Sequence, residues 1–214
     1  MARAFRIRVH GVVQGVGFRP FVYRLATRMN LRGYVKNISG SAVEIFVENG
    51  EVGAFLKALK EEKPEPAKIE KVEVEEVEPM GHREFTILKS DLSSYAESMI
   101  PPDLSICDEC LREIEDPTDR RYRYAFNSCA YCGPRYSMMY HIPYDRENTA
   151  MRHFPLCDKC IQEYKDPNNE RRFHAQGISC PECGPKLWIE DSDGRKLDVS
   201  DPIDEVANFI LEGK

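Results

Sequence analysis

The sequence of 214 residues lacks the features that mark several special classes of protein. It has no apolar run of the ~18 or more residues that a membrane-spanning helix requires, and its mean hydropathy is -0.51. Its Arg-rich start has neither an apolar core nor a small-residue cleavage site, which argues against a targeting peptide. Hydrophobic and charged residues make up 42% and 31% of the chain, close to ordinary globular usage. We therefore expect a folded protein of two modules with no membrane partner.

Acidic residues are absent from residues 1–40, which contain seven arginines and one lysine. The balance is reversed in residues 91–214, which carry 15 basic and 24 acidic residues, and the formal net charge of the whole chain is -6. A basic region on an acidic protein favours a small anionic ligand over a long polyanion, because duplex binding usually needs a broad basic face. We therefore expect no nucleic-acid partner.

The eight cysteines form four Cys-x2-Cys pairs, and nothing in the sequence indicates secretion. In a reducing cytosol such pairs are more often metal ligands than disulfides, so we expect a cytoplasmic protein. Two pairs can surround one Zn²⁺ ion tetrahedrally, and four thiolates leave no open position for a reacting water. The sequence therefore predicts two structural zinc ions, with a catalytic zinc or a redox dithiol as the alternative. The predicted ligands are Cys107, Cys110, Cys129, Cys132, Cys157, Cys160, Cys180 and Cys183.

The cysteine units are an internal duplication. The pair at 107–110 reappears at 157–160, and the pair at 129–132 reappears at 180–183, with offsets of 50 and 51 residues. Each zinc site can form within one repeat or can take one pair from each repeat, and the nearly equal internal spacings of 18 and 19 residues favour the first arrangement. His153 and His174 lie in charged loops and are not predicted as ligands.

Hydrophobic periodicity predicts an α+β fold for the first module. Strands are expected over 5–10, 33–38, 42–47 and 69–77, with a short one at 85–88, and the second and third are joined by a hairpin at 39–41. Helices are expected from Pro20 onward, with proline at the first helical position, and over 51–62. The order is βαββαβ, for which a ferredoxin-like sheet covered by two helices on one face is the economical solution.

The organisation of the chain is expected to follow these patterns. We predict a first domain at 1–90, a linker at 91–105 that is rich in Ser and Pro, and a small duplicated four-cysteine zinc-binding domain at 106–190. Residues 191–214 end in a capped amphipathic helix over 201–211, which we expect to open a following domain.

A glycine-rich loop joins the first predicted strand to the first predicted helix. The residues Gly15, Val16, Gly17, Phe18 and Arg19 place backbone N–H groups and one guanidinium near a helix N-terminus, a pattern suited to a phosphate. The loop is no Walker loop, because no Gly-Lys-Ser/Thr follows, and Pro20 stands where a dinucleotide fingerprint has its third glycine. A tight turn with a surface arginine is the alternative.

The loop sequence 11–19, together with Gly33-Tyr34-Val35-Lys36-Asn37 and Gly40, resembles the acylphosphatase signature over residues 3 to about 90. In that family an arginine at the end of the loop holds the substrate phosphate, and an asparagine on the next strand orients the attacking water. The resemblance implies that Arg19 and Asn37 are the catalytic residues. It also implies a βαββαβ fold, which agrees with the periodicity.

The segment 18–26, the tandem four-cysteine units and the segment 143–151 between them resemble the N-terminal part of the HypF family, the carbamoyltransferases of [NiFe]-hydrogenase maturation. This resemblance implies carbamoyl phosphate, or another acyl phosphate, as the substrate of the first domain. It further implies that carbamate passes to an ATP-dependent domain similar to YrdC and that the carbamoyl group is delivered to HypE. This sequence has no counterpart of those later domains, and we expect it to retain only the first step.

Two other functions are left open by the sequence. Four-cysteine units with interleaved Arg and Tyr, as in the segment 120–124, are compatible with a zinc-dependent nucleic-acid module, although residues 91–190 contain 12 basic and 17 acidic residues. The first domain is also compatible with a non-catalytic anion-binding or docking module.

Overall fold

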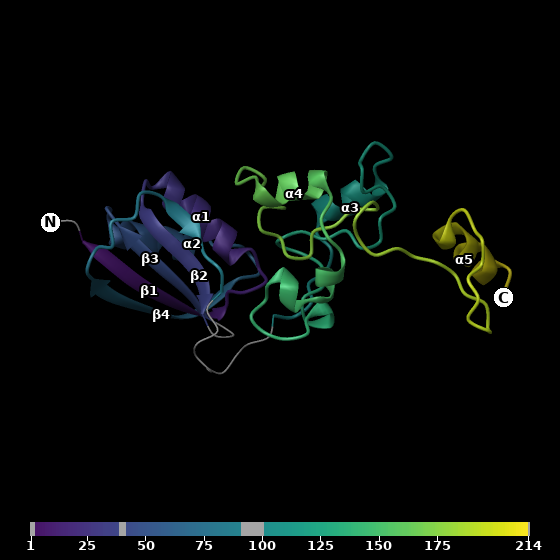
Figure 1. Cartoon of the computed structure of the whole chain (residues 1–214), viewed down its shortest axis with the longest axis horizontal. Helices are drawn as coiled ribbons and strands as arrows, with labels where there is room; N and C mark the ends of the chain where they lie inside the picture. The colour runs from purple at the N-terminus through teal and green to yellow at the C-terminus, as the bar shows by residue number, and fades with distance from the viewer. Residues whose placement is uncertain (1–2, 39–41, 91–100, 214) are drawn as a thin grey trace.

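A computed structural model describes residues 3–38, 42–90 and 101–213 of the protein. Three parts follow one another along its longest axis (Figure 1). A sheet domain at the N-terminal end is followed by a central region of loops and short helices that contains the cysteines. An extended segment then leads to a last helix at the C-terminal end, where Arg123 of the central region pairs with Asp201 and Asp204 at 3.0 and 2.7 Å.

The first part is a five-stranded sheet in the order β4-β1-β3-β2-β5. Neighbouring strands are antiparallel except for β2 and β5, which are parallel. Two helices cover one face of this sheet (Figure 1), and the predicted ferredoxin-like fold is confirmed. The elements are β1 (Ala4–Val12), α1 (Phe18–Arg28), β2 (Arg32–Ile38), β3 (Ala42–Glu48), α2 (Val52–Glu61), β4 (Lys68–Val77) and β5 (Phe85–Ile87).

Strand alternation builds the core between sheet and helices. Ile7 of β1 and Ile45 of β3 are opposite each other in the register and are completely buried. They pack in one cluster with Leu25 of α1 and with Phe55 and Leu59 of α2. Burial of such a side chain contributes about 1.5–3 kcal/mol, so this cluster supplies a rigid platform for the loop between β1 and α1.

Helix α1 begins two residues before the predicted start at Pro20. Gly17 adopts the left-handed conformation at the N-cap, and its carbonyl accepts a hydrogen bond of 3.1 Å from the Phe21 N–H. Pro20 is therefore the third helical residue, where its missing N–H is one of those that have no partner inside a helix. Because α1 begins at Phe18, Arg19 lies in its first turn. The predicted hairpin turn at 39–41 lies outside the described residues.

The central region repeats one short unit twice. Helices α3 (Asp108–Glu115) and α4 (Asp158–Lys165) each begin directly after the first cysteine of a repeat, and the 3-10 helices η1 (Tyr136–Met138), η2 (Arg146–Asn148) and η3 (Ala150–His153) lie between them in the chain. Leu104, which the sequence placed in the linker, exchanges two backbone hydrogen bonds of 3.0 Å with Gly133. This stretch is therefore tied to the first repeat.

The last helix, α5 (Pro202–Leu211), agrees with the predicted capped helix. The Asp201 carboxylate accepts hydrogen bonds from the backbone N–H groups of Ile203 and Asp204, as expected of an N-cap. In the part of the chain that the structure describes, no helix combines the length and the apolar character needed to cross a membrane.

Gly33 of β2 tests the packing of the sheet. Its φ is +136°, and a Cβ at this position would lie 2.0 Å from the Phe46 carbonyl oxygen. We expect Gly33→Ala to lower the free energy of unfolding of the sheet domain by about 2 kcal/mol or more, measured by urea denaturation.

Gly53 of α2 is the matched control, because a Cβ there meets nothing within 4 Å. Gly53→Ala should raise the free energy of unfolding by about 0.5 kcal/mol through the lower chain entropy of the unfolded state. Equal effects of the two substitutions would show that the close approach of Gly33 to β3 is incorrect.

Candidate functional site

The glycine-rich loop leaves β1 and enters α1 through two left-handed residues. Gly15 and Gly17 have φ values of 70° and 72°, a conformation that glycine adopts without steric cost. Gly17 also lacks room for a side chain, since a Cβ would lie 2.7 Å from the Tyr131 ring. The side chain of Gln14 fixes the start of the loop, because its Nε2 donates to the Ala42 carbonyl at 3.1 Å. The predicted phosphate-binding loop therefore has one defined conformation.

Val16 and Phe18 of this loop have their side chains in the core of the sheet domain, where each is 1% exposed. The loop is thus anchored in the core of the sheet domain, while its glycines face the central region. Its backbone N–H groups precede or belong to the first turn of α1, where helix geometry leaves N–H groups without partners inside the helix. A helix N-terminus of this kind attracts anions.

Arg19 reaches across to the cysteine-rich region. Its Nη2 donates to the Asp145 carboxylate at 2.6 Å and to the Tyr144 carbonyl at 3.2 Å. The side chains of Arg19 and Asp145 are each 12% exposed. A charge-assisted pair that is shielded from solvent to this degree is stronger than a surface ion pair. The sequence did not indicate Asp145, because it lies 126 positions along the chain from Arg19.

Asn37 lies near the end of β2, opposite Val43 of β3 in the register. Its side chain is buried, at 1% exposure, and neither Nδ2 nor Oδ1 has a hydrogen-bond partner among the described residues. Unpartnered buried amides are uncommon and call for a bound group such as a water. The structure shows no contact of Asn37 with Arg19, and Asn37 does not line the cavity that Arg19 lines.

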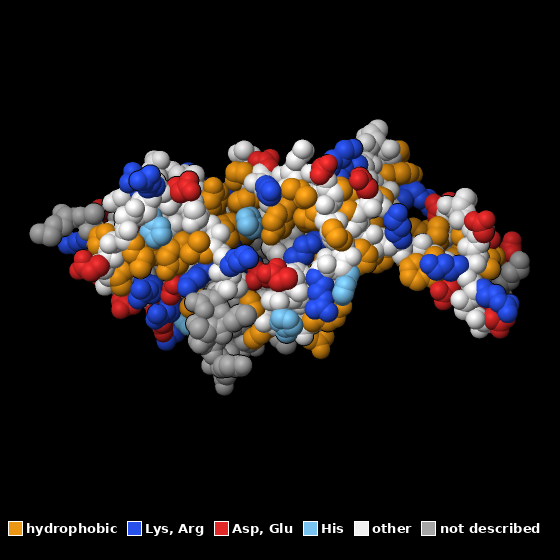
Figure 2. All heavy atoms as spheres, in the orientation of Figure 1, with side chains coloured by type: hydrophobic (Ala, Val, Ile, Leu, Met, Phe, Trp, Pro, Cys, Tyr) orange, Lys and Arg blue, Asp and Glu red, His pale blue; other side chains and the backbone are white. Residues whose placement is uncertain are grey.

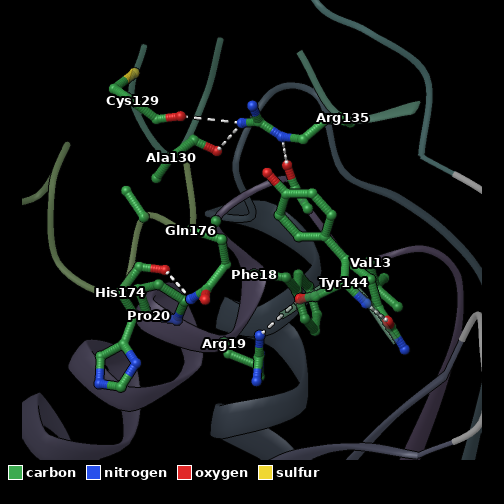
Figure 3. Close-up of a pocket in the computed structure, with 14 residues that line it drawn as sticks. Val13, Phe18, Arg19, Pro20, Cys129, Ala130, Arg135, Tyr144, His174 and Gln176 are labelled. Atoms are coloured by element: carbon green, nitrogen blue, oxygen red, sulfur yellow. Dashed lines mark hydrogen bonds between the residues drawn. The ribbon is translucent and has the colours of Figure 1, made fainter. Parts of the chain in front are cut away.

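The loop and the cysteine-rich region enclose a narrow cavity (Figure 3). Its volume is about 20 Å³, room for roughly one water molecule. The sheet domain contributes its loop and the start of α1, and the cysteine-rich region contributes side chains that face them. The lining includes Gly15, Gly17, Arg19, Arg135, Tyr144, His174 and Gln176.

Arg135 joins the two sides of this cavity. It is 2% exposed, and its Nε donates to the Gly15 carbonyl of the loop. Its Nη1 and Nη2 donate to four backbone carbonyls of the first cysteine repeat at 2.8–3.0 Å, those of Cys129, Ala130, Cys132 and Pro134. Figure 3 shows two of these bonds, to Cys129 and Ala130. The turn that carries two cysteines therefore also holds the loop.

His174 lines the same cavity in a left-handed conformation, with φ 52°. Burial, with a smaller contribution from the positive charge of Arg19, lowers the pKa of this imidazole to about 4. The ring is therefore neutral at neutral pH and adds no charge beside Arg19. From the sequence, His174 was considered only as a metal ligand and was not predicted to be one. Its position at the cavity was not predicted.

The eight cysteines form two groups, and each group comes from one repeat. Cys107, Cys110, Cys129 and Cys132 form the first, and Cys157, Cys160, Cys180 and Cys183 form the second. Within each group the Sγ atoms lie within 4.8 Å of one another, so the arrangement within one repeat is the one observed. His153 and His174 belong to neither group, in line with their exclusion as ligands.

The spacing of the sulfurs fits a tetrahedral ion. Four thiolates at about 2.3 Å from one metal place their sulfurs roughly 3.8 Å apart, and five of the Sγ–Sγ pairs within the two groups lie at 3.6–3.9 Å. These distances are far longer than the ~2.05 Å of a disulfide. In the first group, hydrogen bonds from Cys110 and Cys129 lower the pKa of Cys132 and favour its thiolate, while hydrogen bonds to Cys129 and Cys132 raise the pKa of Cys110.

Each repeat sends arginines to the other repeat's cysteines. Arg171 of the second repeat donates to Cys110 Sγ at 2.9 Å and to Glu113 at 2.6 Å. The equivalent Arg120 of the first repeat donates to Cys160 Sγ at 3.0 Å and to Glu163 at 2.7 Å. Contacts of this kind around metal ligands offset the charge of the thiolates and orient them. The two sites are therefore parts of one reciprocal unit.

Comparison with known proteins matches two separate parts of the chain. Residues 5–87 match the acylphosphatase family, and residues 106–139 and 156–190 each match the HypF finger. An acylphosphatase of Thermotoga petrophila is 42% identical over 87 residues, which are 40% of this chain and 96% of that protein.

Longer proteins match both parts. A probable carbamoyltransferase HypF of Methanocaldococcus jannaschii is 48% identical over 147 residues, 67% of this chain and 19% of that protein. A crystal structure of full-length HypF in a phosphate- and nucleotide-bound form is 43% identical and has a TM-score of 0.90, covering all of this chain and 28% of that one. The chain thus spans 19% and 28% of the lengths of these two HypF proteins. It belongs to the acylphosphatase family, combines that domain with a pair of HypF fingers, and is homologous to part of the HypF carbamoyltransferases.

Proposed function

We propose that this chain hydrolyses acyl phosphates at the loop of residues 15–19, with Arg19 and Asn37 as the catalytic residues. The observation that carries the proposal is the pair of left-handed glycines that leads into the first turn of α1, with the Arg19 guanidinium beside it. Together these groups offer backbone donors and a full positive charge to one phosphoryl group.

Asn37 is suited to hold the attacking water. Its amide is buried and has both a free donor and a free acceptor among the described residues, which is what a water needs in order to be held and turned. It comes from β2, on the same side of the sheet as Val35 of the core and therefore on the side of α1. Catalysis by this pair requires that substrate binding bring the water held by Asn37 to the phosphoryl group held by Arg19.

The chemistry needs little more than position and charge. Water adds to phosphorus, the bond between phosphorus and the acyl oxygen breaks, and the products are phosphate and a carboxylate. Arg19 and the loop N–H groups stabilise the phosphoryl oxygens as negative charge builds on them. A substrate oxygen takes the proton of the water, because His174 at the cavity has a pKa of about 4 and is a weak base.

In the longer protein, carbamoyl phosphate is the proposed substrate. Its hydrolysis would supply carbamate to a following ATP-dependent domain similar to YrdC, and the carbamoyl group would then be delivered to HypE for cyanide-ligand synthesis in [NiFe]-hydrogenase maturation. This role would be carried out in the cytoplasm. The support is the combination of an acylphosphatase domain with two HypF fingers in one chain.

We propose that the two cysteine groups hold one structural Zn²⁺ ion each. The sulfur spacing fits a tetrahedral ion, and four protein ligands per ion leave no position for a reacting water. The repeats are small, and their buried apolar cluster around Ile178 includes cysteines, so metal binding would supply much of their folding free energy.

The nucleic-acid alternative loses its main support in the structure. Arg120 and Arg121 both pair with Glu163, and Arg123 pairs with Asp201 and Asp204, so these charges are neutralised within the chain. On the face drawn in Figure 2, basic and acidic side chains are interspersed and form no broad basic area. A backbone-binding surface needs such an area. A non-catalytic anion-binding module is the competing function. A hydrolysis assay distinguishes it from an acylphosphatase.

Hydrolysis of carbamoyl phosphate and benzoyl phosphate tests the catalytic pair. We expect Arg19→Ala and Asn37→Ala each to lower kcat/KM about a hundredfold, because each removes a group that acts on the reacting atoms. Released phosphate is measured for the chain and both variants.

Arg28→Ala is the control, since Arg28 lies on the same helix and pairs with Glu62 on the surface. It should leave the rate unchanged. Phosphate binding without turnover in the unaltered chain would instead favour the anion-binding module.

Elemental analysis tests the metal proposal. We expect two zinc ions per purified chain, and a decrease in zinc content when Cys110→Ser or Cys160→Ser removes a ligand from one group. A folded unaltered chain with a single zinc ion, or a variant that retains both ions, would contradict one ion per repeat.

A further inference from the structure

We propose that Asp145, in the segment between the two HypF fingers, is a positioning residue that holds the Arg19 guanidinium for phosphate binding. The inference rests on the proposed function and adds to the acylphosphatase site a residue from outside the acylphosphatase domain. Asp145 does not touch the substrate in this proposal and acts through Arg19.

The contacts of Arg19 are divided in a way that suits this role. Both hydrogen bonds of its side chain to the described residues use one nitrogen, Nη2, which donates to the Asp145 carboxylate and to the Tyr144 carbonyl. A terminal guanidinium nitrogen carries two N–H groups, so these two acceptors satisfy it. Nε and Nη1 have no hydrogen-bond partner among the residues that the structure describes. Their three N–H groups are left for a phosphoryl group.

Asp145 is itself held in place. Its second carboxylate oxygen accepts a hydrogen bond from the Ser90 hydroxyl. Its backbone N–H donates to the Pro143 carbonyl at 2.9 Å, and its own carbonyl accepts from the Asn148 N–H at 2.9 Å. Its side chain is 12% exposed. A carboxylate fixed through both oxygens and through its backbone is a firm anchor for a long cationic side chain.

Arginine needs such an anchor at this position. A free arginine side chain loses rotamer freedom when it binds a ligand, and a side chain that is already held loses less. Correct placement of a binding group before substrate arrives is a large part of the advantage of an enzyme, and a misplacement of about 1 Å can cost around a hundredfold in rate. Asp145 therefore lowers the entropy cost of phosphate binding by Arg19.

The same contact has an opposite interpretation, in which the carboxylate competes with phosphate for Arg19. The two interpretations predict opposite changes in phosphate affinity when Asp145 is removed. If Asp145 positions Arg19, its removal weakens phosphate binding, and if it competes, its removal strengthens phosphate binding.

The experiment uses the unaltered chain and its variants. It measures kcat and KM for acyl phosphates, the inhibition constant of inorganic phosphate, and the equilibrium affinity for inorganic phosphate. We expect Asp145→Ala to raise KM and to weaken phosphate binding roughly tenfold or more. Asp145→Asn, which retains an oxygen acceptor for Nη2, should recover part of the loss. In a chain that already carries Arg19→Ala, Asp145→Ala should have no further effect, because the two residues act as one unit.

Asp204→Asn is the matched control. It removes the charge of an α5 carboxylate that pairs with Arg123 at 2.7 Å on the surface, and it should change neither phosphate affinity nor rate. Unchanged or tighter phosphate binding in Asp145→Ala would overturn the positioning role. The proposed function fails separately, through an absence of hydrolysis by the unaltered chain, and the equilibrium affinity for phosphate still reports on Asp145 in that case.

Discussion

The buried guanidinium of Arg135 is the interaction on which the site depends. An arginine side chain has five N–H groups, and Arg135 directs them to five backbone carbonyls. Four of these belong to the first cysteine repeat and the fifth to Gly15 of the loop. A charge at 2% exposure is costly unless every donor is satisfied, so moving the loop away from the finger would leave a donor without its acceptor. The finger and the loop are therefore held in one relative position.

Other arginines also connect separate segments, here the two cysteine repeats, through hydrogen bonds. Arg120 and Arg171 cross between the repeats and bring positive charge to the other repeat's thiolates, with Glu163 and Glu113 balancing them. Some of the acidic residues in this half of the sequence, such as Glu113 and Glu163, therefore pair with arginines inside the structure. Metal binding would stabilise the repeats, the repeats would hold Arg135 and Asp145, and these two residues would hold the loop and Arg19. Metal and phosphate binding would be linked through this series of contacts, although the ions take no part in the proposed chemistry.

Periodicity and cysteine spacing were sufficient to predict the sheet, both helices and the eight cysteines as ligands, because these features depend on local patterns. The grouping within each repeat was only favoured by the spacing, and the structure gives it. The start of α1 was predicted two residues late, since a left-handed Gly17 can cap a helix that proline then continues. Arg19 was predicted from its loop, but Asp145, His174 and Arg135 were not recognised as parts of the site, because docking of two domains leaves no periodic signal. One signal was present: Arg135 and Lys186 occupy equivalent positions in the repeats, yet Arg135 is buried and Lys186 is exposed. Only the first repeat needs five donors at that position.

The most direct test of this account compares the affinity for inorganic phosphate of Arg135→Lys and of Lys186→Arg with that of the unaltered chain, by calorimetric titration. A lysine has three donors on a flexible stem and cannot satisfy the five carbonyls, so the loop should lose its fixed position. We predict that Arg135→Lys weakens phosphate binding roughly tenfold, about 1.4 kcal/mol, while Lys186→Arg leaves it unchanged. A folded Arg135→Lys chain with unaltered phosphate affinity would contradict the claim that the finger holds the phosphate loop.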